Sequence, residues 1–342
     1  MNIKFIISKR YNHFFFVQTL ANWHFSCRSQ FIEKWLKETG PLTEQETKAL
    51  IAFKSVIKKS GFDPIKDCVA VNAFDFFMRF DEFKEKSPFS EKEIKTYLNA
   101  MESLETRFNK VWKIESKKFK NIEKLLSDKF NQTKTEITND LKVLFKDQIN
   151  LEAEIEVILL LSTEESGNGG GGANNGPNII SLECSSINPR DINYLLSTLW
   201  HEITHLILDG YIKKTALIMK NNDIIKEASL EAEKNDFNYA EELLFFSIFS
   251  PMSFLTEKHF STEIAKKLSD SVSKQDTAWL LEARYVFVMY LIYLNGQFIQ
   301  KMLGTNQSIS SPKMANAIIT NHEAIKDFFL KNNKESKWFS YG

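Results

Sequence analysis

The sequence predicts an α+β fold that is mainly helical and contains a small β-sheet. Residues 91–130 carry apolar side chains every three to four positions, with charges between them and no proline or glycine. Two short apolar runs, EIEVILLLST at 154–163 and NIISLEC at 178–184, have the length and composition of strands and flank a glycine cluster. Beyond residue 188 the pattern returns to that of helices.

The first 150 residues are predicted to form a mostly helical region of unknown role. Residues 20–36 and 44–57 have helix-like patterns, and SEKE at 90–93 is a capping box for the long helix that follows. We find no motif with recognisable chemistry in this region.

The remainder, residues 151–342, is predicted to form a second region. We expect its strands within about 155–185, followed by helices at 189–209, about 223–249 and 278–303.

The helix predicted over 189–209 carries end signals. Asn188 is a capping residue, Pro189 suits a first helical turn, and Asp191 places a carboxylate near the free N–H groups. Gly210 is placed to end this helix.

Composition excludes several classes of protein. Lysine plus arginine equals aspartate plus glutamate at 44 each, so no net basic field recruits nucleic acid or an anionic membrane. The three cysteines, Cys27, Cys68 and Cys184, are far apart and lack a CxxC spacing, which favours a reducing compartment. FFFVQTLA at 14–21 is too short to span a bilayer and lacks a clear signal-cleavage site. We therefore expect a cytoplasmic protein without membrane or nucleic-acid partners.

The sequence LWHEITHLILDG at 199–210 holds the one pattern with specific chemistry. On a helix, His201 and His205 project from one face, one turn apart, where two neutral imidazoles can share a Zn²⁺ ion. Glu202 is rotated by about 100° from His201, which suits a base acting on water rather than a third ligand.

TLWHEITHLI resembles the extended signature of the zincin metallopeptidases, with Thr198 three positions before the first histidine and uncharged neighbours. HEITHLILDG is also similar to the thermolysin-like run, in which an acidic residue, here Asp209, follows the second histidine by four positions. The metzincin extension requires a glycine and a histidine where this chain has Leu208 and Tyr211, so that branch is excluded. The resemblance implies a zincin-like metallopeptidase domain over 151–342: a small sheet whose edge strand precedes the active helix, and helices after it.

Gluzincins take their third zinc ligand from a glutamate on a downstream helix, and NYAEELLFFSIF at 238–249 is similar to that segment. Glu242 is the preferred ligand because apolar residues follow it, while Glu241 remains an alternative. The aspartate or alanine that usually follows three to four positions later is replaced by Phe245 and Phe246. Further candidate ligands are Glu227, Glu231 and Glu233.

The glycine stretch GGGANNG at 170–176 occupies the place of the zincin edge strand, which pairs with the substrate backbone. Residues with little or no side chain let another backbone approach closely, so Gly171, Gly172 and Ala173 are predicted to bind substrate. The alternative is a flexible connection between two strands.

The sequence thus predicts a zinc metallopeptidase that acts on a peptide or protein, with Glu202 as base and then proton donor. Tyr285 and His259 are candidates to stabilise the oxyanion, and Asp209 is a candidate to orient a zinc-bound histidine. Two alternatives stay open: a peptide-deformylase-like hydrolase with Cys184 as a ligand, and an inactive zincin-fold binding protein.

Overall fold

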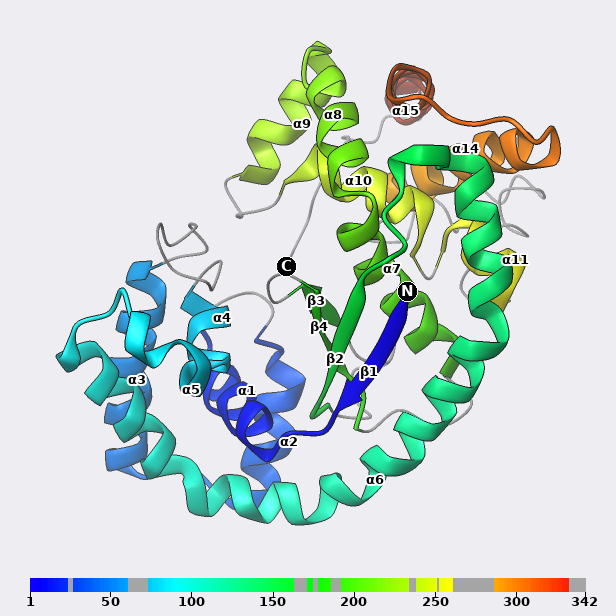
Figure 1. Ribbon diagram of the computed structural model, residues 1–342. Helices are drawn as coiled ribbons and strands as arrows, with labels where there is room; N and C mark the ends of the chain where they lie inside the picture. The colour runs from blue at the N-terminus through cyan, green and yellow to red at the C-terminus, as the bar shows by residue number, and fades with distance from the viewer. Residues whose placement is uncertain are drawn as a thin grey trace. The chain divides into compact units, whose positions relative to one another are not determined.

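In the residues that it describes, a computed structural model of the chain is mostly helical with one four-stranded sheet (Figure 1). The chain forms two compact units that alternate along the sequence: unit 1 is Met1–Asp128 with Glu154–Leu195, and unit 2 is Lys129–Ala153 with Leu196–Gly342. A boundary at residue 150, as the sequence predicts, therefore differs from this division. The structure describes residues 1–23, 27–60, 73–162, 171–174, 178–185, 192–233, 238–250, 252–260 and 286–331.

The sheet belongs to unit 1 and has the strand order β1-β2-β4-β3. β2 and β4 confirm the two predicted strands; both are largely buried and pair in parallel. β1 pairs in parallel with β2, so the first 150 residues are not purely helical, as Ile3 opposite Ile155 illustrates. β3 pairs antiparallel with β4 and forms an edge of the sheet. The strands are β1 (Asn2–Ile6), β2 (Glu154–Leu160), β3 (Gly172–Asn174) and β4 (Ile179–Glu183).

Helices of unit 1 enclose an aromatic core. The helix predicted over 20–36 is wrong in its bounds: α1 ends at Ala21, because Asn22 takes a left-handed conformation with φ of 47°, and α2 begins at Ser29. The side chain of Asn12 ties α1 to the sheet by donating to the Leu159 carbonyl. The helices are α1 (Lys9–Ala21), α2 (Ser29–Thr39), α3 (Glu44–Ser60), α4 (Ala73–Met78), α5 (Phe80–Phe83) and the first part of α6 (Glu91–Phe145), and a 3₁₀ turn spans Lys84–Lys86. Buried rings in this core include Phe14, Phe16, Phe31, Trp35, Phe53, Phe77, Tyr97 and Phe108.

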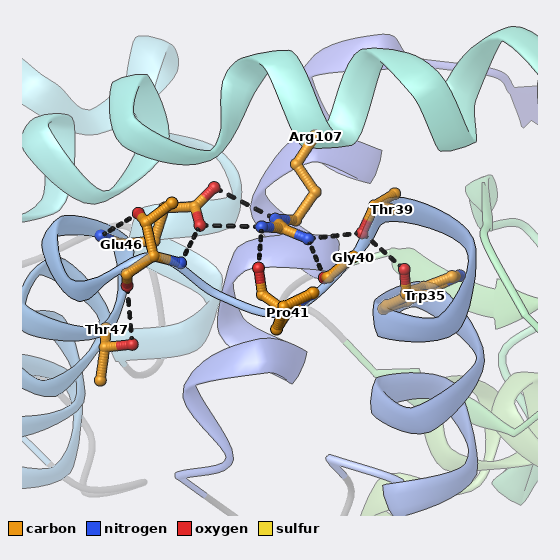
Figure 2. A network of polar contacts seen from close by, with 8 residues as sticks. Trp35, Thr39, Gly40, Pro41, Glu46, Thr47 and Arg107 are labelled. Carbon is orange, nitrogen blue, oxygen red and sulfur yellow. Dashed lines mark hydrogen bonds and ion pairs between the residues drawn. The ribbon is translucent and has the colours of Figure 1, made fainter.

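Arg107 of α6 binds the turn between α2 and α3 (Figure 2). Its guanidinium donates to both carboxylate oxygens of Glu46, at 3.1 and 2.8 Å, and to the Thr39 hydroxyl at 2.7 Å. The carbonyl oxygens of Gly40 and Pro41 accept its remaining hydrogen bonds. All donors of a buried guanidinium are thereby used, as a buried charge requires.

Unit 2 is helical in its described part. α7 ends at Ile207 and α8 begins at Asp209, so Gly210 does not end the motif helix but lies in the first turn of α8. The helix predicted over about 223–249 is divided into α9 and α10. α8 packs against α15, and α10 packs against α8 and α14. The helices after the end of α6 are a 3₁₀ turn at Lys146–Gln148, α7 (Ile192–Ile207), α8 (Asp209–Met219), α9 (Asp223–Glu233), α10 (Tyr239–Ile248), α11 (Phe254–Phe260), α14 (Val286–Gly304) and α15 (Ser311–Lys331).

Among the described helices, none combines the length and the apolar character needed to cross a membrane. Cys27 and Cys184 are buried cysteines that are not joined by a disulfide, and Cys68 lies outside the described residues.

Candidate metal centre

The two histidines of the HEITH motif lie one turn apart on α7, in the part of that helix that belongs to unit 2. Their Nε2 atoms are 3.2 Å apart, and their ring planes cross at 78°. α7 is an apolar helix whose neighbouring side chains, such as Trp200 and Ile203, are fully buried. His201 is buried as well, and His205 is partly exposed, so the pair lies where α7 approaches the surface of its unit.

Glu242 of α10 joins the two histidines. Its Oε2 atom lies 3.9 Å from Nε2 of His201 and 3.9 Å from Nε2 of His205. One potential ligand atom from each of these three residues lies within 4.8 Å of the others, and Glu241 is not part of this group. The structure therefore brings together the three predicted ligands from two helices of unit 2.

The other candidate glutamates are placed differently. Glu227 is an exposed residue of α9 and forms an ion pair with Lys326 at 3.5 Å. Glu231 and Glu233 also lie on α9, but their side chains are outside the described part of the structure.

The three side chains fit a zinc ion in donor type and in spacing. Two nitrogen ligands of a tetrahedral zinc, each about 2.0–2.1 Å from the metal, lie about 3.3 Å apart, close to the 3.2 Å between the imidazoles. The carboxylate oxygen, 3.9 Å from each Nε2 atom, lies about 0.5 Å farther from them than in an ideal tetrahedral arrangement. Two imidazoles and a carboxylate are the protein ligands of many zinc enzymes.

Burial keeps both imidazoles neutral. It lowers the pKa of His201 to about 4, and it lowers the pKa of His205 well below its usual value, with His201 contributing. The Nδ1 atom of His201 lies 2.7 Å from the Phe249 carbonyl oxygen, an arrangement in which Nδ1–H donates and Nε2 keeps its lone pair. At neutral pH the pair therefore presents the form that binds metals.

Glu202 lies beside this group without being a member of it. Its side chain is buried, and burial, with the nearby Glu242 charge, raises the pKa of Glu202 to about 8. Burial likewise raises the pKa of Glu242 to about 7, with a smaller effect of Glu241. Two carboxyl groups with pKa values raised into the neutral range, next to a cluster of imidazoles, are typical of a functional site.

Comparisons with protein-family models, with curated proteins and with solved structures found no match to this chain. The chemistry of the site therefore rests on its own residues.

Asp209 and His259 have partners of their own. Asp209 is exposed and pairs with Lys213 at 2.9 Å, and on His201 the Phe249 carbonyl takes the orienting position that Asp209 was predicted to fill. His259 of α11 contacts Asp140 of α6 through Nε2 at 2.8 Å, and its side chain is buried. Tyr285, the other predicted oxyanion donor, lies outside the described residues.

Cys184 and the predicted substrate-binding residues belong to unit 1. Cys184 directly follows β4 and is buried, and this burial raises the pKa of its thiol. Gly172 and Ala173 lie in β3, opposite Leu182 and Ser181 of β4. Gly171 precedes β3, and its N–H donates to the Glu183 carboxylate at 2.9 Å.

Proposed function

We propose that this chain is a zinc-dependent metallopeptidase of the gluzincin type, in which His201, His205 and Glu242 hold Zn²⁺. The observation that carries the proposal is the grouping of three donor atoms, from the HEITH helix and from α10, beside a buried glutamate that is not one of them. A purely structural zinc site has four protein ligands, whereas a catalytic site has three and an open position. The described group has three.

A bound zinc ion supplies Lewis acidity, which acidifies water and polarises a peptide carbonyl. Glu202 then accepts a proton from the attacking water at a carboxylate oxygen and passes it to the leaving amine nitrogen. A carboxyl group with a pKa near 8 in the metal-free chain holds a proton readily, and the charge of a bound cation lowers this pKa. Glu202 can therefore both take and release a proton near neutral pH.

The proposed substrate is a peptide or protein in an extended conformation. Strand β3 has one partner in the described sheet, β4, so the main chain of Gly172 and Ala173 has a second side on which an extended peptide could pair. Gly171, which precedes the strand, belongs to the same proposed binding segment.

The test is to measure zinc content and hydrolysis of a mixed peptide library together, in four proteins. The native chain should contain about one zinc ion and cleave peptides, and His201→Ala should do neither. Glu202→Gln should keep the metal and lose about 10²–10⁴-fold in turnover, because it removes the base and not a ligand. His13→Phe, which changes a histidine of unit 1 that is not in the ligand group, is the matched histidine control and should resemble the native protein in zinc content and hydrolysis.

Absence of zinc from native protein purified without chelator would overturn the proposal. Loss of zinc in Glu202→Gln would mean that Glu202 is a ligand. Zinc binding without cleavage of any peptide would favour a binding protein instead.

A further inference from the structure

Helix α10 presents three side chains to the two imidazoles of α7. Glu242, Phe245 and Phe246 lie three and four positions apart and so share one face of α10. The His205 ring stacks on Phe245 with centroids 3.6 Å apart and planes at 30°. The His201 ring stacks on Phe246 with centroids 4.7 Å apart and planes at 28°. Each proposed imidazole ligand thus lies against its own aromatic ring.

The two imidazoles differ in the hydrogen bonds that their Nδ1 atoms make. Nδ1 of His201 has the Phe249 carbonyl oxygen at 2.7 Å, a contact that fixes both the tautomer and one edge of the ring. For His205, the described residues provide no hydrogen-bond partner at Nδ1; its described contacts are those of Nε2 and of the ring face. Beside the contacts at Nε2, the stack on Phe245 is therefore the described contact that restrains rotation of the His205 ring.

Metal-ligating histidines need such a restraint. The second ring nitrogen usually donates to a carboxylate, a carbonyl or water, which orients the ring and raises its basicity. Among the described residues, no carboxylate makes this bond to His201 or His205. An aromatic stack stabilises beyond the burial of its area, enough to favour one ring orientation several-fold.

We propose that Phe245 and Phe246 are positioning residues of the metal centre, which hold the imidazoles of His205 and His201 by stacking on their ring faces. At His201 the stack adds to the hydrogen bond of Nδ1 with the Phe249 carbonyl, and at His205 it stands where the described residues provide no such hydrogen bond. The proposal rests on the proposed function, because the imidazoles are taken as zinc ligands. One helix then supplies both the acidic ligand and the aromatic rings that stack on the two histidines, so α10 acts as one face of the site.

The ring orientation can be measured without any metal. In protein labelled with ¹³C and ¹⁵N only at its six histidines, NMR reports the ring protons and the tautomer of each imidazole. The His205 ring protons should be shifted upfield by the ring current of Phe245, and Phe245→Leu should abolish the shift. Phe246→Leu should do the same for His201, whose Nδ1–H tautomer should persist because the Phe249 carbonyl remains.

Metal binding provides the second measurement. By competition with a chelator, each leucine variant should bind Zn²⁺ about 2–10-fold more weakly than the native protein. The visible spectrum of the Co²⁺ form should change in both variants, because the ligand geometry changes. Phe245→Tyr and Phe246→Tyr keep the ring and should restore the native values. Phe145→Leu is the matched control: Phe145 is buried in unit 2 and packs against Tyr211, and no ring contact with either imidazole is described for it, so its loss should leave the imidazole signals and the zinc affinity unchanged.

Native ring-proton shifts and native zinc affinity in both leucine variants would overturn the proposal. It would equally be overturned if the tyrosine variants were as impaired as the leucine variants, since volume rather than stacking would then matter. Should the leucine variants fail to fold, the absence of an upfield shift at His205 in the native protein would still contradict it. A native protein that binds no zinc would remove the proposed function, while the metal-free NMR measurement would decide the ring orientation separately.

Discussion

At the scale of single residues, Glu241 and Glu242 carry the same carboxylate group, but their side chains point in different directions from α10. Adjacent helical residues point about 100° apart, and only Glu242 has an oxygen 3.9 Å from both imidazoles. Glu242→Ala should therefore remove a zinc ligand, and Glu241→Ala should cost at most about 10–100-fold in affinity, as expected for a group outside the ligand set. Chelator competition ranks the two variants. Loss of zinc in Glu241→Ala alone would exchange the assignment, and loss in neither would require a different third ligand.

At the scale of secondary-structure elements, the guanidinium of Arg107 on α6 connects that helix to the end of α2 and the start of α3 (Figure 2). Arg107→Met removes the charge and leaves the Glu46 carboxylate little exposed and without its ion-pair partner, which should lower the free energy of unfolding by about 3–5 kcal/mol. Lys48→Met, which breaks the exposed Lys48–Glu44 pair on α3, is the matched control and should cost at most about 1 kcal/mol. Urea unfolding measures both. Equal, small losses would show that the Arg107 network contributes no more than a surface ion pair.

The edge strand β3 permits a second test at this scale. Gly172→Phe adds a large side chain to the proposed pairing segment and should reduce peptide turnover by interfering with close approach of the substrate backbone. Zinc content and the circular dichroism spectrum should stay native, because the ligand group belongs to the other unit. Unchanged steady-state kinetics in this variant would leave 171–174 as a connection between β2 and β4.

At the scale of the whole molecule, buried neutral histidines should make the fold sensitive to acid. Burial lowers the pKa of His13 in unit 1 to about 4, with Arg10 and Lys9 adding to the effect, and it lowers that of His322 in unit 2 to about 3. The unfolded chain takes up these protons near pH 6.5, before the folded chain does. The contribution of these two histidines to stability is therefore full above pH 6.5 and is lost as the pH drops towards 4.

The denaturation midpoint, measured between pH 7 and 4.5, should show this loss. His13→Phe keeps the stacked ring on Phe108, 4.5 Å from the His13 ring, but cannot be protonated. This variant should lose less stability than the native protein over the same interval. An identical slope in the two proteins would show that His13 does not contribute to the acid sensitivity.

The local sequence pattern was sufficient to predict several parts of this structure. The period of apolar residues over 91–130 predicted α6, which extends over Glu91–Phe145. The capping box is present, with the Ser90 N–H donating to Glu93 at 2.9 Å. The same-face placement of His201 and His205 also followed from the helical repeat, because their spacing is shorter than the helix that carries them.

Contacts between distant segments depended on the tertiary structure. β1 is a strand because β2, some 150 residues later, supplies its hydrogen bonds, and a short N-terminal run carries no local sign of that partner. The choice of Glu242 over Glu241 is decided by how α10 faces α7. One of the contacts that orient His201 comes from a backbone carbonyl that any residue at 249 would provide. The spacing of apolar residues and the capping residues show how a segment forms hydrogen bonds within its own backbone, so they can be read from the local sequence. Strand pairing and the meeting of ligands from different helices depend on which distant surfaces are buried together, and only the tertiary structure decides that.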